Sequence, residues 1–289
     1  MRRARVAHEG ETVDCVLDGG ELVATDGTRI DPETADWRSP AVPSKIAATH
    51  LSYRSRCEEY EMARPPAEPS YFLKPPSALS FHGAEIVRPA GCSYLNYEGE
   101  IAIVIGRRCR GVSIGDALDH VAGYTVANDW GVHDFRHADR GSMLRVKGQD
   151  GFCPLGPYLI DAADVDPEDM VVRTLVNGEV VQEGHTGSDL LFSFAYQVAD
   201  LARLMTLEPG DVILSGTPAH SRPVEPGDIV EVEVEGVGRL ANTVVASDTA
   251  LERVGDQPEV SAATLHVALA MPEDEAERRA AAGERPTGR

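Results

Sequence analysis

One strand-like run in the first half of the chain constrains the fold and the site more than any other stretch. Residues 98–106 read Glu-Gly-Glu-Ile-Ala-Ile-Val-Ile-Gly, a β-branched run closed by glycine that is typical of a strand. Side chains alternate along a strand, so Glu98 and Glu100 point to one side and Gly99 points to the other. Two buried like charges repel each other, and a divalent cation is the simplest remedy.

The same spacing also suits an exposed strand start with two solvated acids, because an E-x-E pattern alone is a weak motif. A third oxygen ligand favours the metal. Asp129 stands at the end of the strand-like run 122–129, and functional groups often lie where strands end. Its alternative role is to cap a helix over residues 130–135.

Two lysines belong to the candidate groups. Lys147 lies in the apolar run Leu-Arg-Val-Lys, which we interpret as a strand, and it is either a site residue or a solvated surface group. Lys74 ends a strand-like run that two prolines stop, and it points either into a site or into solvent.

Composition narrows the class of protein and the class of partner. The 289 residues, 42% of them hydrophobic, suit one large domain with a small extra module. A net charge of −20 argues against nucleic acid or an anionic membrane as the main partner. It leaves room for a small anionic molecule, because a metal and a few cations can reverse the local field.

Several absences favour a reducing cytoplasm as the compartment. No apolar run is long enough for a transmembrane helix, and the first residues lack the apolar segment of a secretory signal. Five cysteines are scattered without C-x-x-C spacing, so a thiolate zinc site is not expected.

The chain divides into three parts. Residues 1–42 predict a small N-terminal β-rich module, with turn signals at Asp18-Gly-Gly and Asp26-Gly-Thr. Residues 43–246 form the main domain. Its second half predicts a hairpin at Asn177-Gly178 and a helix within 189–205. Residues 247–289 read as a charged C-terminal tail, to which the sequence assigns no function.

Seven segments together resemble the fumarylacetoacetate hydrolase family, in the family's order. They are Tyr97-Glu98-Gly-Glu100-Ile-Ala-Ile-Val-Ile-Gly, Gly123-Tyr-Thr-Val-Ala-Asn-Asp129, Arg145-Val-Lys147-Gly-Gln-Asp-Gly, Pro154-Leu-Gly-Pro157, Asn177-Gly178, Ser215-Gly-Thr217-Pro218 and Glu235-Gly-Val-Gly-Arg239-Leu. The resemblance covers about residues 43–245. It implies an α+β, β-rich fold with a rolled mixed β-sheet around the active site, and a homodimer.

The resemblance also implies a site. The metal ligands carry over to Glu98, Glu100 and Asp129, and oxygen-only ligands select Mg²⁺ or Mn²⁺. Lys147 matches the family's active-site lysine, and Thr217 matches a threonine that helps to bind the substrate carboxylate. Family substrates carry a 2-oxo acid or its enol, whose enolate the metal stabilises.

Two positions depart from the family pattern. Hydrolase members carry a His and, three residues later, a Glu that together activate water; here Arg56 stands in place of the His, while Glu59 remains. A guanidinium is a poor general base, so His50 or His82 is a possible substitute. The second departure is His133, where many members carry Arg.

The departures favour family reactions that need no attacking water. The resemblance is greatest to the branch of 5-carboxymethyl-2-hydroxymuconate isomerase and oxo-tricarboxylate decarboxylase, so the sequence predicts an isomerase or decarboxylase of an unsaturated 2-hydroxy/2-oxo diacid. Arg56 or Arg145 is then a candidate for the distal carboxylate, unless both lie on the surface. The alternatives are a C–C hydrolase of acylpyruvate or fumarylpyruvate type, which uses Glu59, and a repurposed member with changed chemistry.

Overall fold

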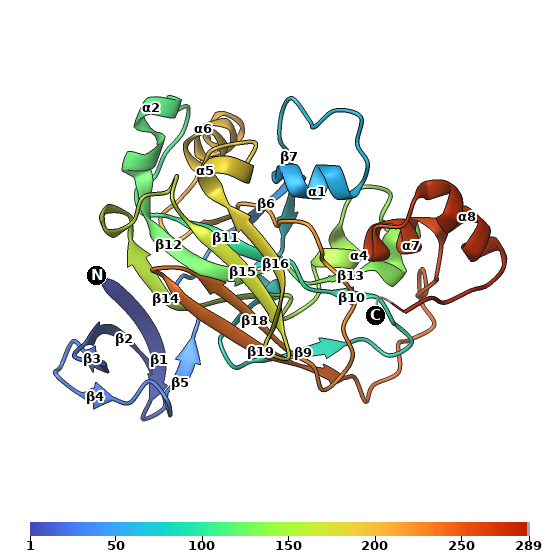
Figure 1. Cartoon of the computed structure of the whole chain (residues 1–289). Coiled ribbons are helices and arrows are strands. Elements are labelled where there is room, and N and C mark those ends of the chain that lie inside the picture. The colour runs from blue at the N-terminus through green and yellow to red at the C-terminus, as the bar shows by residue number, and fades with distance from the viewer. Residues whose placement is uncertain (288–289) are drawn as a thin grey trace.

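Two mixed β-sheets pack on each other at the centre of the computed structural model, which describes residues 1–287 (Figure 1). The larger sheet contains β1 (Arg2–His8), β2 (Glu11–Asp18), β3 (Glu21–Ala24), β4 (Arg29–Ile30), β5 (Asp36–Arg38), β6 (Ile46–His50), β7 (Ser70–Lys74), β8 (Leu79–Phe81), β11 (Gly99–Ile105), β12 (Val121–Asn128), β14 (Cys153–Asp161) and β17 (Val212–Leu214). The smaller sheet contains β9 (Glu85–Arg88), β15 (Val171–Val176), β16 (Glu179–His185), β18 (Ile229–Val234) and β19 (Gly238–Ala246). A short pair joins β10 (Leu95–Asn96) to β13 (Gly131–Val132).

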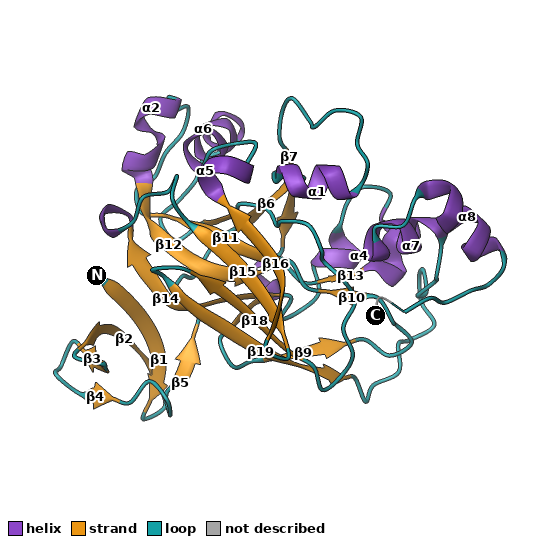
Figure 2. Cartoon of the chain, in the orientation of Figure 1, coloured by secondary structure: helices purple, strands orange, loops and turns teal. Residues whose placement is uncertain are grey.

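Short helices surround the sheets (Figure 2). The α-helices are α1 (Arg54–Glu59), α2 (Ile114–Ala117), α3 (Arg136–Asp139), α4 (Leu144–Lys147), α5 (Thr186–Asp189), α6 (Phe194–Leu204), α7 (Ala262–Leu269) and α8 (Glu273–Ala281). The 3₁₀ turns are η1 (Pro76–Ala78), η2 (Leu118–His120), η3 (His133–Phe135) and η4 (Ala162–Asp164). The predicted β-rich α+β fold is confirmed. None of these helices is long and apolar enough to cross a membrane.

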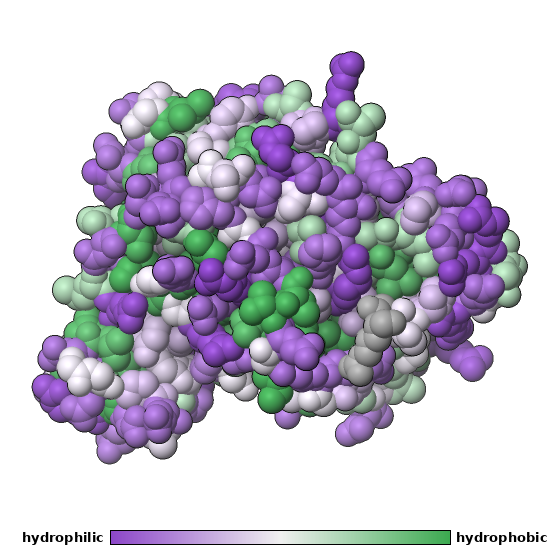
Figure 3. Space-filling model, viewed as in Figure 1, coloured by the Kyte–Doolittle hydropathy of each residue, from purple (hydrophilic) through white to green (hydrophobic). Residues whose placement is uncertain are grey.

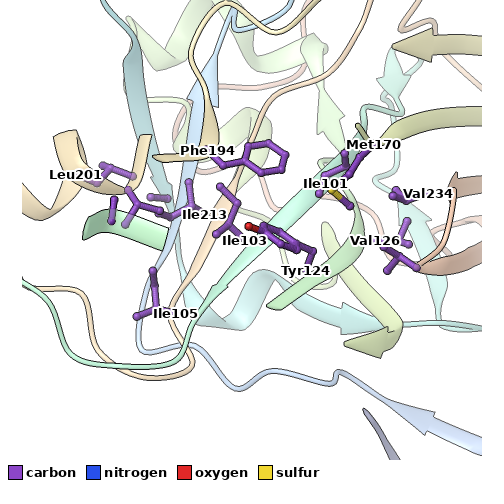
Figure 4. Packing of buried hydrophobic residues seen from close by; sticks show 14 of the residues in the cluster. Ile101, Ile103, Ile105, Tyr124, Val126, Met170, Phe194, Leu201, Ile213 and Val234 are labelled. Carbon is purple, nitrogen blue, oxygen red and sulfur yellow. The ribbon is translucent and has the colours of Figure 1, made fainter. Parts of the chain in front are cut away.

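Strand β11 runs through the middle of the larger sheet, between β12 and β17, and each of its residues is buried. Alternate side chains, Ile101, Ile103 and Ile105, enter the main apolar core with Phe194 and Leu201 of α6 (Figure 4). Burial on both faces explains why this strand reads as a continuous apolar run with no polar alternation.

Local sequence signals are confirmed where turn chemistry or periodicity is strong. Asn177 and Gly178 have φ angles of 51° and 84°, as the two-residue hairpin turn between β15 and β16 requires. Ser193 accepts a hydrogen bond from the Tyr196 amide and begins α6. Strand β18 alternates between buried and more exposed residues, as its Val/Glu pattern predicts.

Residues 2–38 and 262–281 both belong to the packed fold. Strand β1 pairs with β14, so strands β1–β5 extend the larger sheet and pack a small core around Val6, Leu22 and Trp37. At the other end, residues that read as a charged tail form α7 and α8, which pack through Leu265 and Ala268.

A buried carboxylate ties the first strand of the main domain to the core. Asp211, just before β17, accepts hydrogen bonds from the Ser44 amide (3.0 Å) and hydroxyl (2.7 Å) and from the Glu208 amide (2.7 Å), and pairs with Lys45. Burial alone would raise the pKa of Asp211, but these donors outweigh it and lower the pKa.

We expect Asp211→Asn to lower the free energy of unfolding at pH 7 by about 2–4 kcal/mol, because several buried donors lose an ionised acceptor. The lowered pKa means that ionised Asp211 stabilises the fold above its unfolded pKa, and that this contribution is lost as pH falls through the folded pKa. Denaturant unfolding across pH 2–7 measures the gap between variant and wild type, which should shrink in acid.

Asp14→Asn is the matched control, because Asp14 is 79% exposed and pairs only with Arg5; surface pairs contribute little. If the difference in free energy of unfolding between Asp211→Asn and wild type stays constant down to pH 2, ionised Asp211 does not stabilise the fold as assigned.

Candidate active site

A cavity of about 880 Å³ opens beside the end of β11. Its inner wall carries Glu98, Glu100, Asp129, Lys147 and Thr217, which lie far apart in the sequence. The structure therefore brings together the predicted metal ligands, the predicted lysine and the predicted threonine in one place.

Strand pairing sets the position of the three carboxylates. Gly99 lies opposite Asn128 in the β11–β12 ladder, and the Asp129 amide donates to the Glu98 carbonyl at 2.8 Å. One carboxylate oxygen from each of Glu98, Glu100 and Asp129 lies within 4.8 Å of the others. The spacing and the oxygen-only donor set suit a hard divalent cation, and metal binding itself stays a prediction.

Gly99 lets the two glutamates share one side of the strand. A Cβ built at Gly99 would lie 2.0 Å from the Thr174 hydroxyl and 3.1 Å from Val232, both in the smaller sheet. Only a residue without a side chain permits this close approach of the sheets. The glycine therefore places Glu98 and Glu100 toward the cavity while the opposite face stays packed.

Two buried ammonium groups hold the carboxylates. Lys147 Nζ lies 2.6 Å from Glu98 Oε2, 2.7 Å from the Asp129 carbonyl and 3.1 Å from Asp129 Oδ2. Lys74 pairs with the same Asp129 from outside the cavity and donates to the Phe152 carbonyl at 2.8 Å. Lys74 thus points into the protein interior and supports a ligand.

The strand predicted around Lys147 is wrong, because residues 144–147 form the single-turn helix α4. The carboxylate of Asp139 accepts hydrogen bonds from the Arg145 amide (3.0 Å) and the Val146 amide (2.9 Å), and so caps that turn from six residues upstream. A Cβ at Gly131 would lie 2.9 Å from Lys147 Cε. The absence of a side chain at this glycine therefore leaves room for the side chain of Lys147.

The charges of this cluster shift the pKa of its members in opposite directions. Burial and then the charges of Asp129 and Glu98 raise the pKa of Glu100 well above its usual range. Burial opposes ionisation of Asp129, yet Lys147 and Lys74 outweigh it and lower the pKa of that carboxyl. Burial likewise opposes the charge of Lys147, but Asp129 and Glu98 raise its pKa.

Arg56 and Glu59 form a network on the wall next to Glu98. Arg56 Nη1 lies 2.6 Å from Glu59 Oε2, and Arg56 Nη2 lies 3.9 Å from Glu98 Oε1. Glu59 also binds Arg222 at 2.6 Å and the His220 amide at 3.1 Å. Burial alone would raise the pKa of Glu59, but Arg56 and Arg222 lower it, so Glu59 is held as an ionised, fully engaged carboxylate.

Two histidines line the cavity as neutral imidazoles. His133 is buried, and neither ring nitrogen has a hydrogen-bond partner among the described residues. Burial, then Arg136, lowers its pKa well below the usual range. His50 ends β6, and burial followed by the charge of Arg136 lowers its pKa to about 4. A buried ring with two unpaired nitrogens is expected to bind a ligand or water.

Arg136 is a cavity residue that the sequence did not identify. Its side chain lines the cavity and is half-buried, and its guanidinium forms one hydrogen bond within residues 1–287, from Nη1 to the Met143 sulfur at 2.8 Å. A guanidinium with no carboxylate partner suits a substrate carboxylate. Strand β13 and the turn η3 separate Asp129 from Arg136, which begins α3, so no spacing in the sequence indicated that the two residues line one cavity.

Two predicted substrate residues lie elsewhere, so the structure contradicts their placement. His82 lies in the β8–β9 turn, where Nδ1 accepts from the Ala241 amide at 3.1 Å and the ring packs edge-on to Trp37. Arg145 is exposed and pairs with Asp139 and Asp256 on the outer surface of α4. In a helix, residues two apart point in different directions, and so Lys147 faces the cavity while Arg145 faces outward.

Comparison with known proteins assigns the family. The model named Fumarylacetoacetate (FAA) hydrolase C-terminal matches residues 45–245. The chain belongs to the fumarylacetoacetate hydrolase family. This membership identifies it as an enzyme, and the expectation drawn from the seven motifs is confirmed.

Relatives in this family include isomerases and decarboxylases. The 4-hydroxyphenylacetate degradation bifunctional isomerase/decarboxylases of Salmonella dublin and Escherichia coli are 41% and 45% identical over 219 and 206 residues, or 75% and 71% of this chain. The chain spans about half the length of these two relatives, 50% and 48%.

Solved structures show the same architecture. The 5-carboxymethyl-2-hydroxymuconate delta-isomerase of Mycobacterium smegmatis is similar with a TM-score of 0.78 and 36% identity, and covers 86% of this chain and 100% of its own. The maleylpyruvate hydrolase of Sphingobium sp. SYK-6, solved with manganese(II) and pyruvate, has a TM-score of 0.72 and 29% identity over the same shares.

We expect the purified protein to bind one Mn²⁺, and Glu100→Gln to lower that affinity at least ~100-fold, because loss of a ligand costs more than loss of a supporting residue. Titration followed by the electron paramagnetic resonance of free Mn²⁺ measures the binding without substrate.

The matched control for Mn²⁺ binding is Glu231→Gln, in another E-x-E pattern of the chain. That pattern lies on β18, and Glu231 pairs there with Arg239 at 3.0 Å. Equal loss of affinity in both variants, or none in either, would contradict the assignment of the cation site.

Proposed function

We propose that this protein is a divalent-metal-dependent isomerase or decarboxylase of an unsaturated 2-hydroxy/2-oxo diacid of the 5-carboxymethyl-2-hydroxymuconate type. One observation carries the proposal: the cluster of Glu98, Glu100 and Asp129 shares a cavity with the guanidinium of Arg136, which has no carboxylate partner within residues 1–287. The family membership and the names of the relatives support the same reaction class.

The residues fit a bound cation on electrostatic grounds. Three carboxylates face two ammonium groups, Lys147 and Lys74. Burial, and then repulsion from Asp129 and Glu98, raises the pKa of Glu100, and a bound cation would oppose both effects. Glu98, Glu100 and Asp129 would hold Mg²⁺ or Mn²⁺. When bound, the ion supplies Lewis-acid polarisation of the oxo acid.

Two imidazoles and an ammonium line the same cavity as the carboxylate cluster. Isomerisation needs a proton removed from one carbon and returned to another, and decarboxylation needs a proton delivered after CO₂ leaves. Burial, then the charge of Arg136, lowers the pKa of His133 and His50 and makes both weak bases, so we assign these imidazoles to hydrogen bonds with the substrate. Lys147 keeps its proton beside Glu98 and Asp129, so we assign it to electrostatic stabilisation of the developing negative charge.

The second carboxylate of the substrate is assigned to Arg136, with Arg56 beside it. Arg56 already binds Glu59, whereas Arg136 donates only to a thioether in the described structure. The carboxylate therefore gains most at Arg136, where it displaces a weak acceptor. Thr217, whose hydroxyl accepts from Gln182 at 3.1 Å, is assigned to the other carboxylate of the substrate.

The runner-up function, C–C hydrolysis, requires a base for water. Glu59 is the family residue that remains, but Arg56, Arg222 and the His220 amide occupy its oxygens. A carboxylate whose pKa is lowered in this way is a weaker base. This network favours the reactions that need no attacking water.

Assembly and compartment stay proposals. The family resemblance predicts a homodimer and the composition predicts a reducing cytoplasm, with a small anionic oxo acid as the partner.

Turnover tests the proposal. We expect purified protein to isomerise or decarboxylate 5-carboxymethyl-2-hydroxymuconate-type acids, EDTA to abolish the reaction, and Mg²⁺ or Mn²⁺ to restore it, measured by the ultraviolet absorbance of the dienol. Lack of turnover across a panel of such acids, with the metal bound, would overturn the proposal.

Glu59→Gln separates the two candidate functions. Isomerase or decarboxylase activity should survive this change, and hydrolysis of an acylpyruvate, if the protein catalyses it, should be lost. The hydrolase would be favoured if wild type does not turn over the diacids and the variant loses all activity on acylpyruvates.

Arg136→Met should raise KM for the diacid about 30–100-fold, with a smaller change in kcat, because a charge-assisted contact to a non-reacting carboxylate contributes about 2–3 kcal/mol of binding. Arg145→Met is the matched control and should change neither constant. If Arg145→Met changes KM as much as Arg136→Met does, the distal carboxylate is not bound by Arg136 alone, and Arg145 is again a candidate, as the sequence predicted.

A further inference from the structure

The residues beyond the family match form part of the cavity wall. The match ends at residue 245, and the chain then continues into α7 and α8. Side chains from these helices and their connection line the cavity, among them His266, Val267, Met271, Glu273 and Glu277. Figure 1 shows the two helices side by side at the right of the molecule, next to α1 and α4.

This wall is attached firmly to the catalytic domain. The Thr264 hydroxyl donates to the His133 carbonyl at 3.0 Å, Asn96 donates to the Ala268 carbonyl at 2.9 Å, and the Tyr60 hydroxyl donates to the Val267 carbonyl at 3.1 Å. Leu265 and Ala268 are fully buried. The wall therefore has a defined position relative to the site.

The face of α8 toward the cavity is acidic. Glu277 follows Asp274 by three residues and Glu273 by four, so it neighbours both on the helix surface. All three acids line the cavity and are exposed. Ala276, on another face, is buried against α7. The surface over α8 is correspondingly hydrophilic (Figure 3).

The cavity therefore has an inner end with cations and an outer end with anions. Lys147, Arg56 and Arg136 lie at the inner end, toward the carboxylate cluster. At the outer end Asp274 is paired with Arg278 at 2.7 Å, while no ion pair forms at Glu273 or Glu277 within residues 1–287. A ligand carboxylate is stabilised at the inner end and repelled at the outer one.

We propose that α8 acts as a charge filter for ligand length, with Glu273 and Glu277 as specificity-determining residues. The cavity accepts oxo acids whose carboxylates all reach the inner cations and disfavours oxo acids long enough to place a carboxylate beside α8. An equally long ligand with an uncharged end escapes this repulsion. The inference rests on the proposed function, because it takes the oxo-acid end of the ligand to lie at Glu98, Glu100 and Asp129.

Calorimetric binding to the Mn²⁺-loaded protein at low salt tests the filter with three probes. 2-Oxoglutarate is short, whereas 2-oxosuberate and 2-oxooctanoate have the same chain length and differ in a terminal carboxylate or methyl group. The double variant Glu273→Gln/Glu277→Gln should bind 2-oxosuberate about tenfold more tightly than wild type does. Affinities for 2-oxoglutarate and 2-oxooctanoate should change less than twofold.

Glu275→Gln is the matched control, since Glu275 lies on the same helix, pairs with Arg279 at 2.6 Å and does not line the cavity. It should leave all three affinities unchanged.

Different results would overturn the charge filter and the proposed function. Binding of 2-oxoglutarate with no gain for 2-oxosuberate in the double variant overturns the filter alone. A gain equal for 2-oxosuberate and 2-oxooctanoate also overturns it, because the wall would then select by size. Absence of 2-oxoglutarate binding to metal-loaded wild type overturns the proposed function, and with it the filter.

Discussion

Repulsion among three carboxylates in a space of 4.8 Å is the constraint on which the site depends. Two of them are fully buried, and an isolated buried charge is too costly to persist. Two buried ammonium groups compensate these charges from opposite sides of Asp129. Lys147 faces the cavity and Lys74 lies behind Asp129. Removing either lysine takes away one of the two ammonium groups that contact Asp129, and so the pairs belong to the fold as much as to the site.

The surroundings of the cavity follow from this arrangement. Asp139 forms the turn that carries Lys147, and Gly131 leaves room for its side chain. Past this cluster, Arg56 shares its charge with Glu59 and Glu98, whereas Arg136 is left without a carboxylate. The site is therefore anionic where a cation fits and cationic where a carboxylate fits.

Sequence reasoning succeeded where chemistry depends on local geometry. Strand alternation placed Glu98 and Glu100 together, and the family register added Asp129 and Thr217. It failed where a side chain is oriented from a distance. Lys147 was expected on a strand because it lies in an apolar run, whereas Asp139, distant from it in the sequence, caps a helical turn there. Arg145 was expected in the site because a guanidinium suits a distal carboxylate, but on that turn it faces outward.

Helices α7 and α8 were read as a tail because α8 is mostly charged and alanine-rich. Few of its residues are buried, so its sequence resembles that of a solvent-exposed helix. Arg136 was missed for a related reason: a single arginine in a short irregular helix carries no periodicity. We propose it as a binding residue because it has no carboxylate partner among the described residues, and a sequence does not show which contacts are missing.

Gly99 supplies no side-chain atom to the proposed metal site, yet it determines where the two glutamates point because its backbone packs closely against Thr174 and Val232. In a mutational scan that scores metal loading, this position should rank with the ligands themselves. Alanine, the smallest replacement, would separate the two sheets and turn the strand, so a purely steric residue would be recorded as a coordinating one. Such a scan does not separate coordinating residues from a glycine whose backbone packs directly against side chains of the neighbouring sheet.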